Sequence, residues 1–464
     1  MEQTRENKMG TTPMLKLILS MSLPAMFSML VQALYNIVDS IFVSRLGVNA
    51  LAAVSLAFPI QTLLIAVAVG TGVGINSLIS RRLGEKDVEA ADKAATHGLF
   101  LGVFSWIPFL IFGLFFCRPY MAAFSETAQV VDMGANYLAI VCTLSVGCIV
   151  EIMVEKTLQA TGNMIYPMLF QLSGAITNII LDPIFIFGYF GVPAMGVAGA
   201  AIATVIGQFV ALIFSLVILF TKSHQVRITL RGFRFNGKTI RDIYAVGLPS
   251  IVMQAIGSVM NMGMNGILAA FSDTAVAVLG AYYKLQSFVF MPVFGLNQGV
   301  MPVLGYNYGA RKRRRFTSAM KIGSMIALLI MALGTLLFWI MPEQLLDIFK
   351  EAGQQSADPE LLRIGVPALR IISLCFIPAA LGILFSTAFQ ATGMGMRSLI
   401  ISLLRQLILI LPVAYLLALT GEVVNVWYAF PIAEAVSLIV SILFYISLYR
   451  KHIAPIEEKA DSSR

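Results

Sequence analysis

Long apolar segments alternate with short polar ones along the whole chain. Segments of about 20 or more residues, the length that crosses about 30 Å of hydrocarbon as α-helix, recur throughout. We expect membrane-spanning helices at residues 15–44, 50–80, 94–118, 131–158, 165–190, 194–221, 243–271, 276–306, 317–341, 363–388, 395–419 and 424–449. The pattern therefore predicts an all-α integral membrane protein with twelve transmembrane helices.

The second half of the chain repeats the first, about 225 positions later. Six predicted helices fall in each repeat, and an even number makes both halves enter the membrane in the same direction. We therefore expect two six-helix lobes related by a pseudo-twofold axis along the membrane normal. The matched positions include Leu23-Pro24 and Leu248-Pro249, Asn36 and Asn261, Gly70 and Gly295, Gly74 and Gly299, Gly84 and Gly309, and, at a slightly different offset, the tetrapeptides 159–162 and 390–393.

This organisation divides the chain into an N-terminal lobe at 1–221, a linker at 222–242, a C-terminal lobe at 243–450 and a tail at 451–464. Lys and Arg crowd the linker and the loops that follow the second and eighth helices, all on one predicted side. Since cytoplasmic loops retain positive charge, we expect both termini in the cytoplasm.

Composition narrows the function classes. With 58% apolar and 12% charged residues, the chain is not an ordinary soluble domain, and its net charge of +8 reflects membrane orientation more than nucleic-acid binding. The four cysteines lie in apolar segments and the three histidines are scattered, which argues against disulfides and a zinc or haem site. We expect no cofactor and, without an HExxH, GxSxG or Walker motif, no enzyme of those classes.

Acidic residues inside predicted membrane helices are the main functional candidates, because an ionisable group in hydrocarbon is costly unless it is paired or hydrated. The first lobe contains Asp39, Glu151, Glu155 and Asp182, and Asn178 shares a helix face with Asp182 at i, i+4 spacing. Counting about 1.5 Å per residue places Asp39 and Asp182 at similar depth, with Glu155 lower. We predict that these two aspartates share a proton or sodium ion with Asn178 as a neutral ligand; whether Glu151 joins Glu155 stays open.

A purely structural role for these acids, such as pairing with Lys156, is the alternative. The repeat argues against it, because the positions that match Asp39, Glu155 and Asp182 carry uncharged residues in a lobe of the same expected fold. Those residues are Met264, Ser386 and Val413. In the second lobe both signs of charge are present, and Arg405 with Glu434 is the structural pair that we expect first.

Pro24 interrupts the first helix on the same segment as Asp39, so it is either a hinge or a static bend. A substrate cleft between the lobes would combine adaptable methionines, aromatic rings that attract cations, and a few polar groups. The candidate cleft residues on the seventh and eighth helices are Gln254, Asn261, Gln286, Met291 and Phe294.

The run from Asn36 to Gly47, NIVDSIFVSRLG, closely resembles the helix 1 signature of the MATE family, the multidrug and toxic compound extrusion transporters, in its MepA-like bacterial branch. The resemblance covers the whole chain and implies a V-shaped fold in a bacterial inner membrane that exports cationic drugs and dyes by antiport with protons or sodium. It implies that Asp39, Asn178 and Asp182 form the cation site, that Glu155 is a polar site position and that Pro24 marks a kink. The acids that another branch carries on helices 7 and 10 are missing.

Other functions were weighed. A lipid-linked sugar flippase of the same superfamily would need cationic residues for pyrophosphate, whereas this first lobe buries acids. An intramembrane aspartyl protease lacks its GxGD context, and a passive channel does not need acids that load and unload. We expect small organic cations and the lipid bilayer as partners, no nucleic acid, and a monomer.

Overall fold

A computed structural model describes residues 7–349 and 358–456, apart from the side chains of Ser40 and Ser44; the last eight residues of the predicted tail lie outside it. All regular elements in this part of the chain are helical. The principal helices are α1 (Lys8–Thr11), α2 (Met14–Ser44), α3 (Val48–Gly84), α4 (Val88–Phe115), α5 (Cys117–Phe124), α6 (Ala128–Thr143), α7 (Val146–Ala160), α8 (Ile165–Phe187), α9 (Val197–Thr221), α10 (Gly237–Ala269), α11 (Asp273–Gly309), α12 (Arg313–Ile340), α13 (Pro342–Asp347), α14 (Pro359–Ile372), α15 (Phe376–Ala391), α16 (Gly395–Leu403), α17 (Leu411–Ala418), α18 (Val423–Val426) and α19 (Ala429–Leu448).

Among the described residues, 11 helices are long and apolar enough to cross a membrane, and one bent pair brings the number to 12. The all-α class and the number of spans are thus confirmed. The bent pair corrects one prediction: the helix expected at 131–158 is divided into α6 and α7, which meet at 43°. Ser145 in the break donates its hydroxyl to the carbonyl of Cys142 at 2.8 Å, a local bond that competes with helix continuation.

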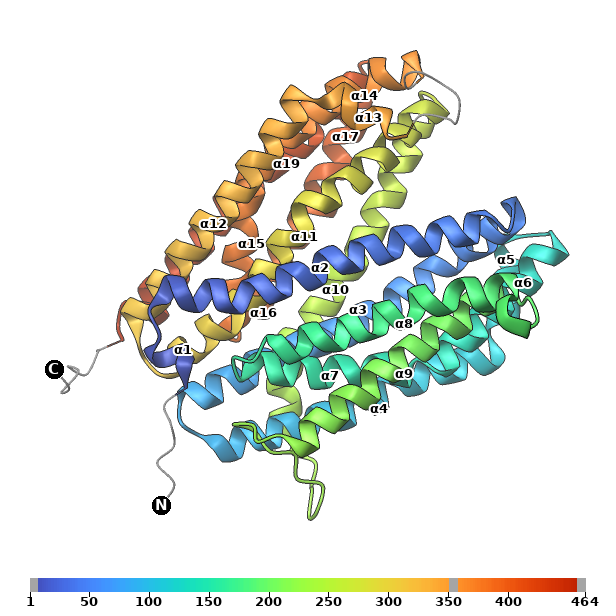
Figure 1. Ribbon diagram of the computed structural model, residues 1–464. Coiled ribbons are helices and arrows are strands. Elements are labelled where there is room, and N and C mark those ends of the chain that lie inside the picture. The colour runs from blue at the N-terminus through green and yellow to red at the C-terminus, as the bar shows by residue number, and fades with distance from the viewer. Residues whose placement is uncertain (1–6, 350–357, 457–464) are drawn as a thin grey trace.

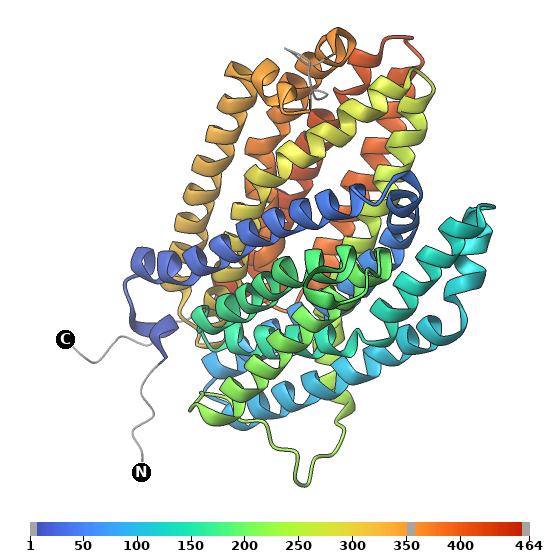
Figure 2. The same cartoon turned by 45° about the vertical axis from the view of Figure 1, so that its right-hand side comes forward.

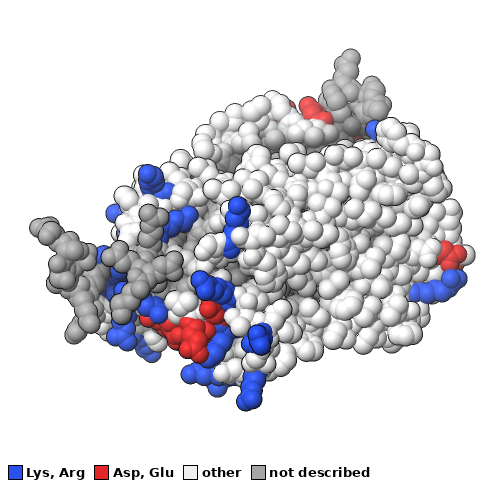
Figure 3. All heavy atoms as spheres, turned by 60° about the horizontal axis from the view of Figure 1, so that its bottom comes forward, with Lys and Arg blue, Asp and Glu red and all other residues white. Residues whose placement is uncertain are grey.

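Two helical bundles diverge from the end of the molecule at which both termini lie (Figure 1). Helices α2 to α9 form one bundle and α10 to α19 the other, and the same divergence is visible after rotation (Figure 2). On the face shown in Figure 3, Lys and Arg gather over the end with the termini, and a broad uncharged surface separates them from a small charged group at the opposite end. This distribution suits a protein whose middle is surrounded by lipid.

Glycines of the repeat join the two bundles where they converge. A Cβ on Gly70 would lie 2.6 Å from the backbone nitrogen of Ile251 in α10, and one on Gly295 would lie 2.5 Å from that of Met26 in α2. The two contacts correspond through the repeat: Gly70 matches Gly295, and Met26 matches Ile251, about 225 positions apart in each case. The same reciprocity relates Gly84 with Tyr306 to Gly309 with Arg81. The interface between the lobes is therefore built around a pseudo-twofold axis.

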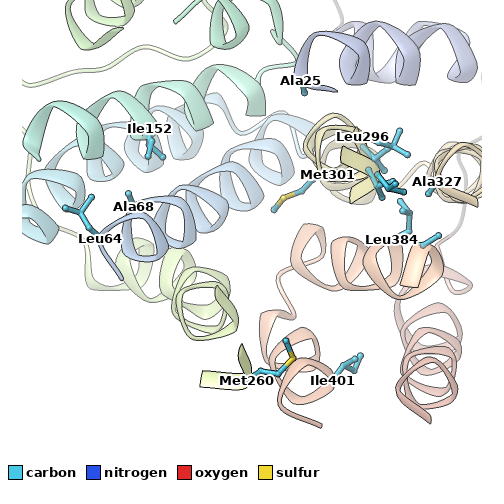
Figure 4. Packing of buried hydrophobic residues seen from close by; sticks show 14 of the residues in the cluster. Ala25, Leu64, Ala68, Ile152, Met260, Leu296, Met301, Ala327, Leu384 and Ile401 are labelled. Atoms are coloured by element: carbon cyan, nitrogen blue, oxygen red, sulfur yellow. The ribbon is translucent and has the colours of Figure 1, made fainter. Parts of the chain in front are cut away.

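Apolar side chains fill each bundle separately away from this junction. Leu64 and Ala68 of α3 lie near Ile152 of α7 in the first bundle (Figure 4). Leu296 of α11 and Leu384 of α15 lie together in the second. All four cysteines are buried and free, as their apolar surroundings predicted.

A short N-terminal segment, residues 7–12, bridges the convergent ends of both bundles. On the first bundle, the Asn7 amide donates to the carbonyl of Thr161 at 3.1 Å. On the second, Asn307 and Arg315 donate to the carbonyl of Met9 at 3.1 and 3.0 Å. The Met9 side chain is fully buried. This segment, which we call the N-terminal strap, therefore ties the two bundles at one end.

Candidate functional site

Two membrane aspartates from different helices meet in the first lobe. Asp39 extends from α2 and Asp182 from α8, and their carboxyl groups lie within hydrogen-bonding reach of each other. Asp182 is fully buried, and one oxygen of each carboxyl group, Oδ1, has no hydrogen-bond partner among the described atoms. Two ionised carboxylates cannot hydrogen-bond, since neither has a donor, so a hydrogen bond between them requires a proton on one of them.

Asn178 lies one turn before Asp182 on α8 and completes the group, as the i, i+4 spacing predicted. In the amide orientation that satisfies both of its neighbours, Asn178 donates to Asp182 Oδ2 at 2.7 Å and accepts from Thr204 Oγ1 at 3.1 Å. Its oxygen therefore faces Thr204 on α9, and the amide nitrogen faces the carboxyl pair. The amide nitrogen of Asn178 thus donates a hydrogen bond to the carboxyl group of Asp182. The amide oxygen is bonded to Thr204, so it is not turned toward a metal ion between the aspartates.

Tyrosines surround the pair. The Tyr35 hydroxyl is hydrogen-bonded to Thr204, and Tyr137 of α6 accepts a 2.7 Å bond from the amide of Gln61. Both rings lie close enough to the two aspartates to interact with them electrostatically. The sequence analysis did not include these tyrosines. Tyr35 lies four residues before Asp39 on α2, a spacing that could have identified it, whereas Tyr137 belongs to another helix and carries no such signal.

Glu155 lies apart from the aspartates, in a separate polar network. Its carboxylate is 2.8 Å from the Lys156 ammonium and accepts 2.8 Å bonds from Gln159 and Gln171. Lys156 also donates to Gln298 of α11 at 2.9 Å, which connects the two lobes. The pairing with Lys156 that the sequence offered as an alternative is thus present, and Glu155 is held by a full set of partners.

A cavity of about 610 Å³ opens beside this network. Helices α2, α3, α7, α8 and α9 form most of its wall, and Gln254 of α10 and Gln298 of α11 close it from the second lobe. Glu151 and Glu155 line it together, and Asn178 connects it to the aspartate pair. The first lobe therefore contributes most of a chamber that two acidic side chains line and that Asn178 links to the aspartate pair.

Four of the five predicted cleft residues lie outside this chamber. Gln254 is in its wall, whereas Asn261, Gln286, Met291 and Phe294 lie on α10 and α11 and are not among its lining residues. Phe294 is 40% exposed. Helix α2 continues without interruption through Pro24. The roles assigned to these residues stay predictions.

The second lobe has no equivalent of the aspartate pair. Met264 is fully buried in the position matching Asp39. The expected pair forms instead: Arg405 Nη1 lies 3.4 Å from both carboxylate oxygens of Glu434. Arg405 belongs to a π-helical segment, Leu404–Ile410, between α16 and α17. Its charge is thus matched by a structural partner, as predicted.

The repeated architecture agrees with a comparison of the sequence with family models. The model MatE matches residues 24–184 and 249–416, one match in each repeat. The chain belongs to the MatE family. The resemblance seen in the first helix of the sequence is therefore confirmed across the two lobes of this MatE protein.

Individual relatives of this MatE chain have distinct names. The multidrug export protein MepA of Staphylococcus aureus is 26% identical over 433 residues, which cover 93% of each chain. A FAD transporter of Shewanella oneidensis is 28% identical over 429 residues, covering 91% of this chain and 92% of the relative. A solved outward-facing multidrug resistance MATE transporter has a TM-score of 0.90 and 29% identity over 97% of this chain and all of its own. The fold is thus that of MATE transporters.

Proposed function

We propose that this MatE protein is a secondary active exporter of lipophilic organic cations, driven by protons that bind at the Asp39–Asp182 pair. The observation that supports proton coupling is the close approach of the two carboxyl groups, because a proton held between them lets them form a hydrogen bond. The orientation of Asn178 supports the same choice, because its oxygen faces Thr204 and leaves a sodium ion with one ligand fewer than the sequence suggested.

The charge of the cavity supports cationic cargo. Lys156 is the one cationic side chain among its lining residues, and it is neutralised by Glu155 at 2.8 Å. Glu151 is a second acid on this wall, and a cation bound beside it stabilises its ionised form. A FAD molecule or a lipid-linked sugar presents pyrophosphate, which needs unpaired Lys or Arg. Among the relatives' cargoes, the drugs of a multidrug exporter therefore suit this cavity better than FAD.

The cavity is formed almost entirely by the first lobe, so we assign cargo binding and proton binding to the same lobe. Asn178 contacts the aspartate and also lines the cavity. Protonation and cargo binding then compete if each favours a different arrangement of α2, which carries both Asp39 and Pro24. We further propose that the protein works as a monomer in a bacterial inner membrane with both termini in the cytoplasm.

Transport assays in proteoliposomes, with the purified protein reconstituted in the membrane, test this function. A fluorescent quaternary dye such as ethidium should be transported under an imposed pH gradient, and a sodium gradient alone should drive no transport. Asp39→Asn and Asp182→Asn should each abolish transport, because an asparagine cannot share a proton with the remaining aspartate. Asp132→Asn is the matched control, since Asp132 pairs with Arg118 at the exposed surface.

Two results would contradict the proposal. Transport that follows the sodium gradient alone would replace the proton with sodium as coupling ion. Asp39→Asn protein that keeps transport driven by the pH gradient would remove the aspartate pair from the mechanism altogether.

A further inference from the structure

Four buried polar atoms on the cavity wall have no hydrogen-bond partner. They are Ser28 Oγ, Glu151 Oε1, Gln171 Oε1 and Gln208 Oε1. Three of the four are oxygens of carboxylate or amide groups, which accept hydrogen bonds and do not donate them. A buried acceptor without a donor is unfavourable, so these oxygens favour a ligand that supplies N–H or O–H groups.

Neighbouring contacts fix which atom of Gln171 is available. Its amide nitrogen donates to Glu155 Oε2 at 2.8 Å, so its oxygen is the atom left for a ligand. Glu155 itself is saturated by Lys156, Gln159 and Gln171. The wall therefore separates into a neutralised part around Glu155 and a part whose acceptors are unused.

Glu151 is the acid of this wall that has no ion-pair partner. It lies one helical turn before Glu155 on α7, is 7% exposed, and has Glu155 and Lys156 as its charged neighbours. Lys156 is in contact with Glu155 and is hydrogen-bonded to Gln159 and Gln298. Glu155 and Lys156 pair with each other, so the carboxyl group of Glu151 lines the cavity with one oxygen, Oε1, unpartnered, and a bound cation would favour its ionised form.

We propose that Glu151, Gln171 and Gln208 form a subsite for cations that carry N–H donors, namely amidinium, guanidinium or primary ammonium groups. The three residues come from α7, α8 and α9, so three helices of the first lobe contribute to the subsite. A quaternary cation neutralises Glu151 but leaves both glutamine oxygens unpaired, whereas an amidinium satisfies charge and acceptors together. The inference rests on the proposed export of organic cations and adds a preference within that class.

Two fluorescent or radiolabelled cations distinguish charge from hydrogen bonding. DAPI carries amidinium groups, and tetraphenylphosphonium carries no N–H at all. Their affinities are measured on the purified full-length protein at one pH and ionic strength. Gln208→Leu should weaken DAPI binding about tenfold and change tetraphenylphosphonium binding less than about twofold, because one hydrogen bond to a charged group is lost for DAPI alone.

Glu151→Gln keeps the size of the side chain and removes its charge, so it should weaken both ligands, DAPI by the larger factor. Glu126→Gln is the control, since Glu126 is exposed and outside the cavity. Circular dichroism and melting temperature establish that each variant is folded.

The outcomes separate the subsite from the function on which it rests. Gln208→Leu protein that loses both ligands equally, or neither, would overturn the N–H preference. Unchanged DAPI affinity in Glu151→Gln would exclude Glu151 from the subsite. Wild-type protein that binds neither cation would overturn cation export itself.

Discussion

Alanine at Gly84 should destabilise the junction between the lobes. The added Cβ would lie 2.0 Å from the carbonyl oxygen of Tyr306 on α11. A carbon and a carbonyl oxygen normally approach to about 3.3 Å, so α3 and α11 must separate by about 1.3 Å. Because the clashing atom belongs to the backbone of a packed helix, rotation of a side chain cannot relieve it. We expect a loss of about 1–3 kcal/mol in stability.

The reciprocal contact permits a sharper test. Alanine at Gly309 would meet the carbonyl oxygen of Arg81 at 2.1 Å, across the same pair of helices. Separation caused by the first substitution also makes space for the second, so the double variant should lose less stability than the two single variants combined. Gly280→Ala on α11 is the control, since a Cβ there meets nothing within 4 Å.

Thermal unfolding of the detergent-solubilised protein, followed by fluorescence, measures these effects. Both single variants should melt below wild type, and Gly280→Ala should not. If Gly84→Ala has the same melting temperature as the Gly280→Ala control, the close approach of α3 and α11 does not contribute to stability. Strictly additive effects of Gly84→Ala and Gly309→Ala would show that the two contacts are independent.

Three further predictions concern other parts of the molecule. Pro24→Ala should leave dye affinity unchanged and slow transport if Pro24 lets α2 bend, and equal transport rates would leave Pro24 a packing residue. Glu434→Gln should lower stability by about 3 kcal/mol, because Arg405 is left without its partner. Replacement of both Glu434 and Arg405 by Met should recover most of this stability, as measured by thermal unfolding. A double variant as unstable as Glu434→Gln would contradict this account. Asn307→Ala removes a 3.1 Å bond to Met9, so trypsin should cleave after Lys8 faster than in wild type, and an unchanged rate would show that the remaining bonds suffice.

Much of the fold was predictable because lipid imposes simple rules on sequence. Spans follow from apolar length, and the repeat predicted which glycines would be matched across the lobes. The break between α6 and α7 was not predictable from hydropathy, because both halves are apolar. The π-helical segment at Arg405 has no apolar signature either.

The candidate site was predictable in part. The i, i+4 relation joined Asn178 to Asp182 within one helix, and a depth estimate placed Asp39 near them. Contacts between helices that depend on rotation about the helix axis were not predictable. The bond from Lys156 to Gln298 is such a contact, because it joins residues of different lobes.

The reciprocal glycine contacts have a consequence for the origin of the two-lobed chain. A surface that pairs the same positions of two copies is self-complementary, as in a homodimer with twofold symmetry. A single six-helix repeat with these glycines therefore already carries both sides of the interface. Since Asp39 and Asp182 take no part in these glycine contacts, one copy of the acids can be lost after duplication without disturbing assembly. The junction thus allows the two halves to diverge in chemistry while they remain equivalent in architecture.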